Sequence, residues 1–151
     1  MATHPESPYV FGVRDLIHKP GEERTFERDL VVPDQLGAGV AVVAAGEPLE
    51  LDVRLESVHE GILASADVST VARGQCVRCL IDVELPVQVD FQELFAYSLE
   101  DAYDFEVRDD TVDLEEPLRD AVVLSLPFQL LCEPDCPGLD PETGERLADR
   151  A

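Results

Sequence analysis

The sequence predicts an α+β protein that is mainly β, in which an antiparallel sheet is packed by one principal helix near the C-terminus and paired cysteines lie in turns. Apolar and polar residues alternate with period two through the middle of the chain, and one later segment repeats its apolar residues with helical spacing. With 151 residues, 45% of them apolar, the chain is large enough to bury a core. We therefore expect a single domain over residues 1–151.

Short extended segments open the chain. Residues 9–13 form a candidate first strand, residues 25–32 form a second that ends at Pro33, and glycines enclose an apolar segment at 37–46. Two half-buried strands follow, on either side of a turn at Gly61. Their inward positions are Leu49, Leu51, Val53 and Leu55, then Ile62, Ala64, Ala66, Val68, Thr70 and Ala72.

The clearest strand comes next. Its apolar face comprises Ile81, Val83, Leu85, Val87, Val89 and Phe91. One apolar face per strand is typical of an antiparallel sheet with one side in water. Because proline cannot donate a ladder hydrogen bond, Pro86 places this strand at an edge or at a bulge.

One helix is expected near the C-terminus. Asp113 and Glu116 have the spacing of an N-terminal cap, and Pro127 ends the segment. The apolar residues that recur on one face are Leu118, Val122 and Leu126. We expect this helix to lie on the apolar face of the sheet and to lead the chain to the second cysteine pair.

The four cysteines form two close pairs, Cys76 with Cys79 and Cys132 with Cys136. Four thiolates are a ligand set of structural zinc, so we expect all four sulfurs to converge on one zinc ion. The first pair lies at the tip between two alternating strands, and Gly74 before it permits a close backbone approach. A thiol–disulfide redox protein that uses Cys76 and Cys79 remains an alternative, although such pairs usually begin a helix.

The charge is extreme, since 33 acidic residues against 11 basic ones give a formal net charge of −22. Such a surface disfavours broad docking on nucleic acid and suits either a basic partner or simple solubility. Residues 93–116 concentrate the acidic pattern with aromatic residues interspersed. We expect there either an exposed loop with a short strand at 103–107 or a surface that engages a basic partner.

No catalytic motif is found among those that bind phosphates or dinucleotides or that define zinc proteases and serine hydrolases. We expect no enzyme and no small-molecule substrate. The start of the sequence has no secretory pattern and no apolar run spans a bilayer, so we expect a cytoplasmic protein without a membrane partner. Arg73 and Arg78 flank the first cysteine pair and are expected to offset the charge of a zinc–thiolate centre, with RNA contact as the alternative.

Three stretches together resemble a known family. They are Arg73-Gly74-Gln75-Cys76-Val77-Arg78-Cys79-Leu80, then Glu93-Leu94-Phe95-Ala96-Tyr97, then Leu124-Ser125-Leu126-Pro127-Phe128-Gln129-Leu130-Leu131-Cys132 with Cys136-Pro137-Gly138-Leu139 after it. The combination resembles the YceD family, whose members are described as large ribosomal RNA subunit accumulation proteins. The resemblance covers the chain from about residue 10 to residue 147. It implies a bacterial cytosolic factor needed for 23S ribosomal RNA to accumulate, with no enzymatic activity.

The chain departs from that family at Asp140 and Thr143, where many members carry a further cysteine pair. A zinc site confined to the tail is therefore not expected; the alternatives are the joint site of all four cysteines or reduced, buried thiols without metal. Asp140 is a poorer candidate ligand than a fourth thiolate. The expected partner is a ribosomal protein or a pre-large-subunit particle, with ribosomal RNA contacted indirectly, and an acidic scaffold that inhibits a basic partner remains a further alternative.

Overall fold

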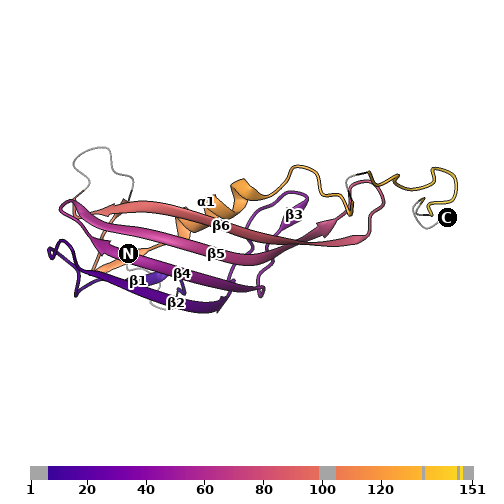
Figure 1. Ribbon diagram of the computed structural model, residues 1–151. Helices are drawn as coiled ribbons and strands as arrows, with labels where there is room; N and C mark the ends of the chain where they lie inside the picture. The colour runs from indigo at the N-terminus through magenta and orange to yellow at the C-terminus, as the bar shows by residue number, and fades with distance from the viewer. Residues whose placement is uncertain (1–6, 99–104, 134, 146, 148–151) are drawn as a thin grey trace.

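The computed structural model describes residues 7–98, 105–133, 135–145 and 147. The elements in chain order are β1 (Val10–Gly12), β2 (Glu23–Val31), β3 (Ala41–Val42), β4 (Pro48–Ser57), β5 (Gly61–Gln75), β6 (Asp82–Ala96), β7 (Phe105–Glu106), β8 (Thr111–Asp113) and α1 (Glu115–Ser125). The molecule is elongated, and its longer strands run along its length (Figure 1). Over the described residues, the predicted class is confirmed: antiparallel β structure dominates and a helix lies near the C-terminus.

The main sheet has the order β2-β4-β5-β6-β7, with β3 paired to the far end of β5. The long strands are antiparallel neighbours, whereas the short β7 runs parallel to β6. Since β7 covers only Phe95 and Ala96, the rest of β6 is an edge of the described sheet. Pro86 lies in that uncovered part, which confirms the edge position predicted for it.

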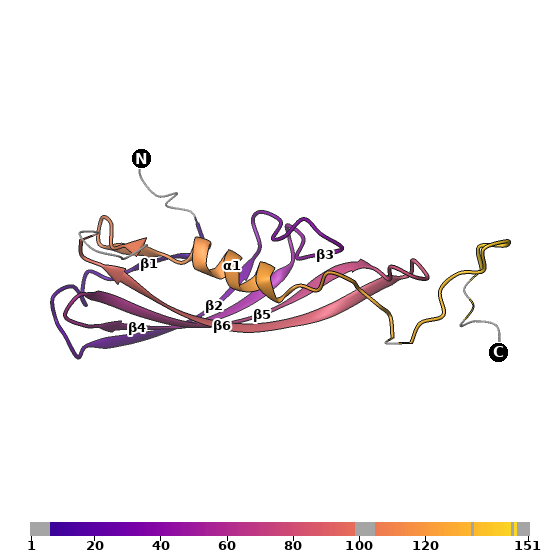
Figure 2. The ribbon, with the colours of Figure 1, turned by 90° about the horizontal axis from the view of Figure 1, so that it is seen from above.

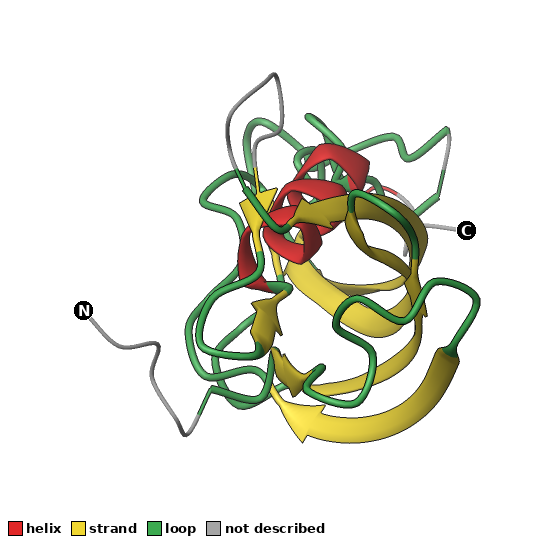
Figure 3. Ribbon diagram, turned by 90° about the vertical axis from the view of Figure 1, so that its left-hand side faces the viewer, coloured by secondary structure: helices red, strands yellow, loops and turns green. Residues whose placement is uncertain are grey.

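The core lies between the inner face of the sheet and α1. Strand β4 alternates buried and exposed positions as predicted, so one face points inward and the other outward. Seen end-on, the sheet curves and α1 lies against its concave side (Figure 3). The helix buries Pro117, Leu118 and Val122 there, and it packs mainly against β6, over the long strands in the view from above (Figure 2).

The start of α1 differs in detail from the prediction. The carboxylate of Asp113 accepts a hydrogen bond from the backbone N–H of Glu115 at 3.0 Å, two residues on. The helix begins there, and Leu114 occupies the cap position without a side-chain hydrogen bond. The predicted cap spacing between Asp113 and Glu116 is therefore wrong, although Asp113 does satisfy one of the helix's free amides.

The interpretation of residues 93–116 as an exposed loop is wrong at both ends. Strand β6 continues through Ala96 because Phe95 enters the core, where it is 2% exposed. The chain returns in β7 and then in β8, which pairs with β1 in a small second sheet. Residues 99–104 lie outside the described part of the chain, so only Phe105–Glu106 of the predicted strand at 103–107 is observed.

Among the described residues, no helix combines the length and the apolar character that crossing a bilayer requires.

Candidate metal centre

The first cysteine pair lies at the tip of the hairpin between β5 and β6. The two strands stay paired as far as Gln75 and Asp82, and residues 76–81 form the turn. Within it, the backbone N–H of Cys76 donates to the carbonyl of Ile81 at 2.9 Å, and that of Leu80 donates to the carbonyl of Cys76 at 2.9 Å. These bonds close the turn as the alternating strands on both sides predicted.

Gly74 allows neighbouring segments to approach this tip closely. A Cβ atom at this position would collide with the carbonyl oxygen of Val40 and would stand 2.8 Å from the side chain of Leu130. The prediction of a close backbone approach is therefore confirmed, and no residue larger than glycine fits without a shift.

Backbone contacts dock the second pair onto the same tip. The N–H of Val77 donates to the carbonyl of Leu130 at 2.8 Å, and the guanidinium of Arg78 donates to the carbonyl of Cys136 at 3.0 Å. The chain beyond α1 runs along the sheet toward the hairpin tip before it reaches these contacts (Figure 2). Gly138, at φ +88°, then turns against the backbone of Arg78.

The result is a cluster of four sulfur atoms that lie within 4.8 Å of one another. The Sγ atoms of Cys76 and Cys136 are 3.7 Å apart, as are those of Cys79 and Cys132. A disulfide would need about 2.05 Å, so no disulfide joins the sulfurs of either pair. Zinc–sulfur bonds of about 2.3 Å arranged as a tetrahedron separate neighbouring sulfurs by about 3.8 Å, so the spacing and the soft donors both fit zinc.

The pKa values of Cys76, Cys132 and Cys136 are shifted in different directions. Burial acts to raise the pKa of Cys76, but hydrogen bonds from the backbone N–H groups of Cys79, Cys132 and Arg78 outweigh it and lower that pKa to about 6. Burial raises the pKa of Cys136 to about 12 and also raises that of Cys132. A divalent cation would supply the positive charge that lets the remaining thiols ionise beside one another.

Other residues singled out in the sequence have different roles. The carboxylate of Asp140 accepts hydrogen bonds from the N–H groups of Glu142 at 2.8 Å and Thr143 at 3.3 Å, so it shapes a turn of the tail. Arg73 forms ion pairs with Glu47 at 2.8 Å and Glu84 at 2.7 Å.

Arg78 therefore contacts the cysteine cluster directly, through the carbonyl of Cys136. The guanidinium of Arg73 is instead bound by the carboxylates of Glu47 and Glu84. The sequence did not identify the carbonyl of Leu130 or the amides that bind the Cys76 sulfur. Backbone groups carry no residue signature, so only the spacing of the motif could have indicated them.

Comparison with known proteins identifies the family of this chain. A family model described as "Large ribosomal RNA subunit accumulation protein YceD" matches residues 64–151, which include most of β5, all of β6 and α1, and both cysteine pairs. The chain belongs to the YceD family. The predicted resemblance is thus confirmed.

Several relatives of this YceD-family chain carry no functional name. An uncharacterized protein of Mycobacterium tuberculosis is 40% identical over 152 residues, covering 96% of this chain and 73% of the relative. One from Mycobacterium leprae is 38% identical, with 95% and 70% covered. The Bacillus subtilis protein YlbN, also uncharacterized, is 34% identical over 62 residues, or 38% of this chain and 36% of its own length. No solved structure matches the chain significantly.

Proposed function

We propose that this YceD-family protein is a non-catalytic, cytoplasmic factor of ribosome biogenesis that supports accumulation of 23S ribosomal RNA and assembly of the large subunit. The observation that carries the proposal is the family match over residues 64–151, because the family is described as a large ribosomal RNA subunit accumulation protein. The same residues include the hairpin tip and α1, so the part of the fold with the most distinctive chemistry is the part that the family shares.

The charge supports a basic protein as the direct partner. At a formal net charge of −22, the chain repels RNA phosphates at long range and attracts cationic surfaces. Ribosomal proteins and assembly intermediates that expose them offer such surfaces, so we propose a ribosomal protein or a pre-large-subunit particle as the partner, with ribosomal RNA reached through it.

Within this proposal, Cys76, Cys79, Cys132 and Cys136 hold a structural zinc ion. The ion would join the hairpin tip to the chain beyond α1, two segments that are far apart in the sequence. Four protein ligands leave no open coordination position for a substrate, and such closed sites stabilise a fold rather than catalyse a reaction.

Deletion of the gene tests the role. During fast growth, we expect reduced 23S ribosomal RNA relative to 16S and fewer large subunits, both restored by a plasmid copy. Unchanged levels would contradict the proposed function. Purification of the tagged protein at increasing salt concentration, with the co-purifying RNA measured, tests how the RNA is bound. Direct contacts to RNA phosphates weaken steeply with salt, whereas RNA that is recovered through a bound ribosomal protein should decrease less.

A thiol–disulfide function is a second candidate, favoured by the lowered pKa of Cys76. It requires Cys76 and Cys79 to form a reversible disulfide, which removes two of the four zinc ligands. Native mass spectrometry and alkylation of the purified protein distinguish the redox function from the zinc site. One zinc ion per chain with unreactive thiols contradicts the redox function, and a metal-free chain with a reducible Cys76–Cys79 disulfide contradicts the zinc site.

A further inference from the structure

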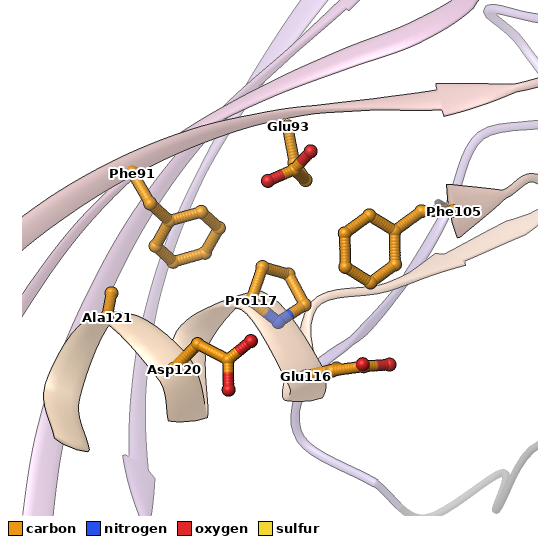
Figure 4. Close-up of a pocket in the computed structure, with 7 residues that line it drawn as sticks. All are labelled: Phe91, Glu93, Phe105, Glu116, Pro117, Asp120 and Ala121. Atoms are coloured by element: carbon orange, nitrogen blue, oxygen red, sulfur yellow. The ribbon is translucent and has the colours of Figure 1, made fainter. Parts of the chain in front are cut away.

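A cleft of about 510 Å³ separates α1 from the end of β6, away from the cysteine cluster. Phe91 and Glu93 of β6, Phe105 of β7, and Pro117 and Asp120 of α1 are among its lining residues. In Figure 4 the two phenylalanine rings stand on opposite sides of the space, the Glu93 carboxylate points between them, and Pro117 lies across from it. The cleft is therefore an aromatic slot with an acidic group at its centre.

The walls of this slot are held in place by the fold. Phe105 is fixed by the pairing of β7 with β6, and its ring lies 5.4 Å from the ring of buried Phe95. Phe91 belongs to the inner row of β6, and Pro117 is buried in the first turn of α1. Because these groups pack against the core, the slot needs little rearrangement to receive a ligand.

The charge of the cleft selects a cation. Glu93 carries its carboxylate inside it, and Glu116 and Asp120 add two more from the helix. The basic residue of α1, Arg119, turns elsewhere, donating to Glu115 at 3.3 Å and to the carbonyl of Gln35 at 3.2 Å. Aromatic faces and carboxylates together attract guanidinium and ammonium groups, while a phosphate would meet three like charges.

Exposed apolar side chains follow along the chain from the helical wall of the cleft. Leu124 lies one helical turn beyond Asp120 on the same side of α1 and is 84% exposed, and Phe128 beyond the helix is 98% exposed. Side chains of this size that stand fully in water commonly mark a protein–protein contact. An acidic, aromatic cleft beside exposed leucine and phenylalanine suits a protein segment that alternates basic and apolar residues.

We propose that the cleft between β6 and α1 is the docking site for a basic protein segment, which places an arginine or lysine side chain between Phe91 and Phe105 and an apolar side chain against Leu124. The inference rests on the basic partner of the proposed function and names the surface that receives it. The cation contacts both rings and the Glu93 carboxylate.

A short synthetic peptide of alternating arginine and leucine, with both ends blocked, is the probe. Added to the isotope-labelled full chain, it should shift the amide resonances of Glu93, Phe105, Ala121 and Leu124, and the same peptide with uncharged citrulline for arginine should not. Shifts spread evenly over the acidic surface would overturn the proposal. A 23S RNA fragment that shifts these amides at physiological salt in place of the peptide would also overturn it.

Variants separate the cleft from general charge attraction. Glu93→Gln should weaken peptide binding about three- to fivefold, and Glu93→Gln with Phe105→Leu about tenfold. Asp90→Asn makes the same charge change on the opposite, solvent-facing side of β6 and should stay within about twofold of the parent. Equal weakening by Glu93→Gln and Asp90→Asn would contradict a specific site.

The same variants in the deletion strain distinguish this inference from the proposed function. The Glu93→Gln, Phe105→Leu gene should fail to restore 23S ribosomal RNA although its product accumulates, and the Asp90→Asn gene should restore it. Full restoration by the double variant would overturn the docking site and leave the ribosomal role intact. A deletion without any effect on 23S ribosomal RNA would instead remove the proposed function.

Discussion

The two ends of this elongated molecule are stabilised in different ways. The body, made of β2, β4, β5, β6 and α1, buries a continuous core in which Leu51, Leu55, Val68 and Leu118 are fully shielded from solvent. The cysteine end, residues 76–81, 131–133 and 135–139, has a separate small cluster of thiols with a few partly buried apolar residues around it. The body therefore buries many more apolar side chains than the cysteine end does.

This difference shows which interactions each region depends on. Burial of apolar surface contributes about 25 cal/mol per Å² and needs no particular partner, so the body tolerates chemical change outside its core. The cysteine end is held by backbone hydrogen bonds such as Val77 to Leu130 and, in our proposal, by zinc. Substitutions and removal of metal should therefore lower the stability of the two regions by different amounts.

The largest effect is expected in the body. Leu118→Ala removes a fully buried side chain between α1 and the sheet and should lower the free energy of unfolding by about 3 kcal/mol. Leu124→Ala, six positions along the same helix and 84% exposed, should change it by less than about 0.5 kcal/mol. Urea denaturation measures both, and similar losses for the two variants would contradict the assignment of the core.

Removal of metal should act on the cysteine end. A strong chelator or Cys136→Ser should lower the melting temperature of the zinc-loaded protein by roughly 5–10 °C, the shift expected if bound zinc contributes about 3 kcal/mol. Hydrogen exchange should rise at residues 76–81, 131–133 and 135–139 more than in β4. Asp140→Asn, which keeps a side-chain acceptor for the turn, should leave zinc content and melting temperature unchanged; loss of zinc from this variant would make Asp140 a ligand.

The junction between the two regions depends on a glycine. Gly74→Ala places a methyl group against the carbonyl of Val40 and the side chain of Leu130, and relieving that overlap should cost about 1–3 kcal/mol. A Cβ at Gly39 meets nothing within 4 Å, so Gly39→Ala is the matched control and should be nearly neutral. Thermal unfolding compares the stability of the two variants. Equal stability would show that Val40 and Leu130 do not lie close to residue 74 in solution.

The smallest expected change is a gain. Tyr9 is 1% exposed, and its hydroxyl has no hydrogen-bond partner among the described residues, so Tyr9→Phe should stabilise the body by about 1 kcal/mol. Burial, with a smaller contribution from Glu115, raises the pKa of Tyr9 to about 12.

The raised pKa sets the direction of the pH dependence at Tyr9. As the pH rises from about 10 to 12, the unfolded chain loses the phenolic proton before the folded one, and the parent protein loses stability. Unfolding curves at pH 8 and pH 11 should show that Tyr9→Phe lacks this particular loss. A variant that is less stable at pH 8 would indicate a hydrogen bond to the hydroxyl.

Much of the fold could be predicted because its signals are local. The alternation in residues 49–55 and 62–72 indicated β4 and β5, Pro86 indicated the edge position of β6, and the spacing of Leu118 and Val122 indicated the buried face of α1. In each of these cases the periodicity or the covalent restriction acts within a few residues. The meeting of the four sulfurs was also predicted and is observed, but it rested on the shared ligand chemistry of two distant pairs and not on a local signal.

What only the tertiary structure decided depends on residues distant in sequence. No local pattern shows which distant segments come close together. Examples are the ion pairs of Arg73 with Glu47 and Glu84, the hydrogen bond between Val77 and Leu130, and the cleft between Phe91 and Phe105. The continuation of β6 to Ala96 was missed for the same reason. Its acidic pattern resembles a loop, and burial of Phe95 against the rest of the core overrides that local preference.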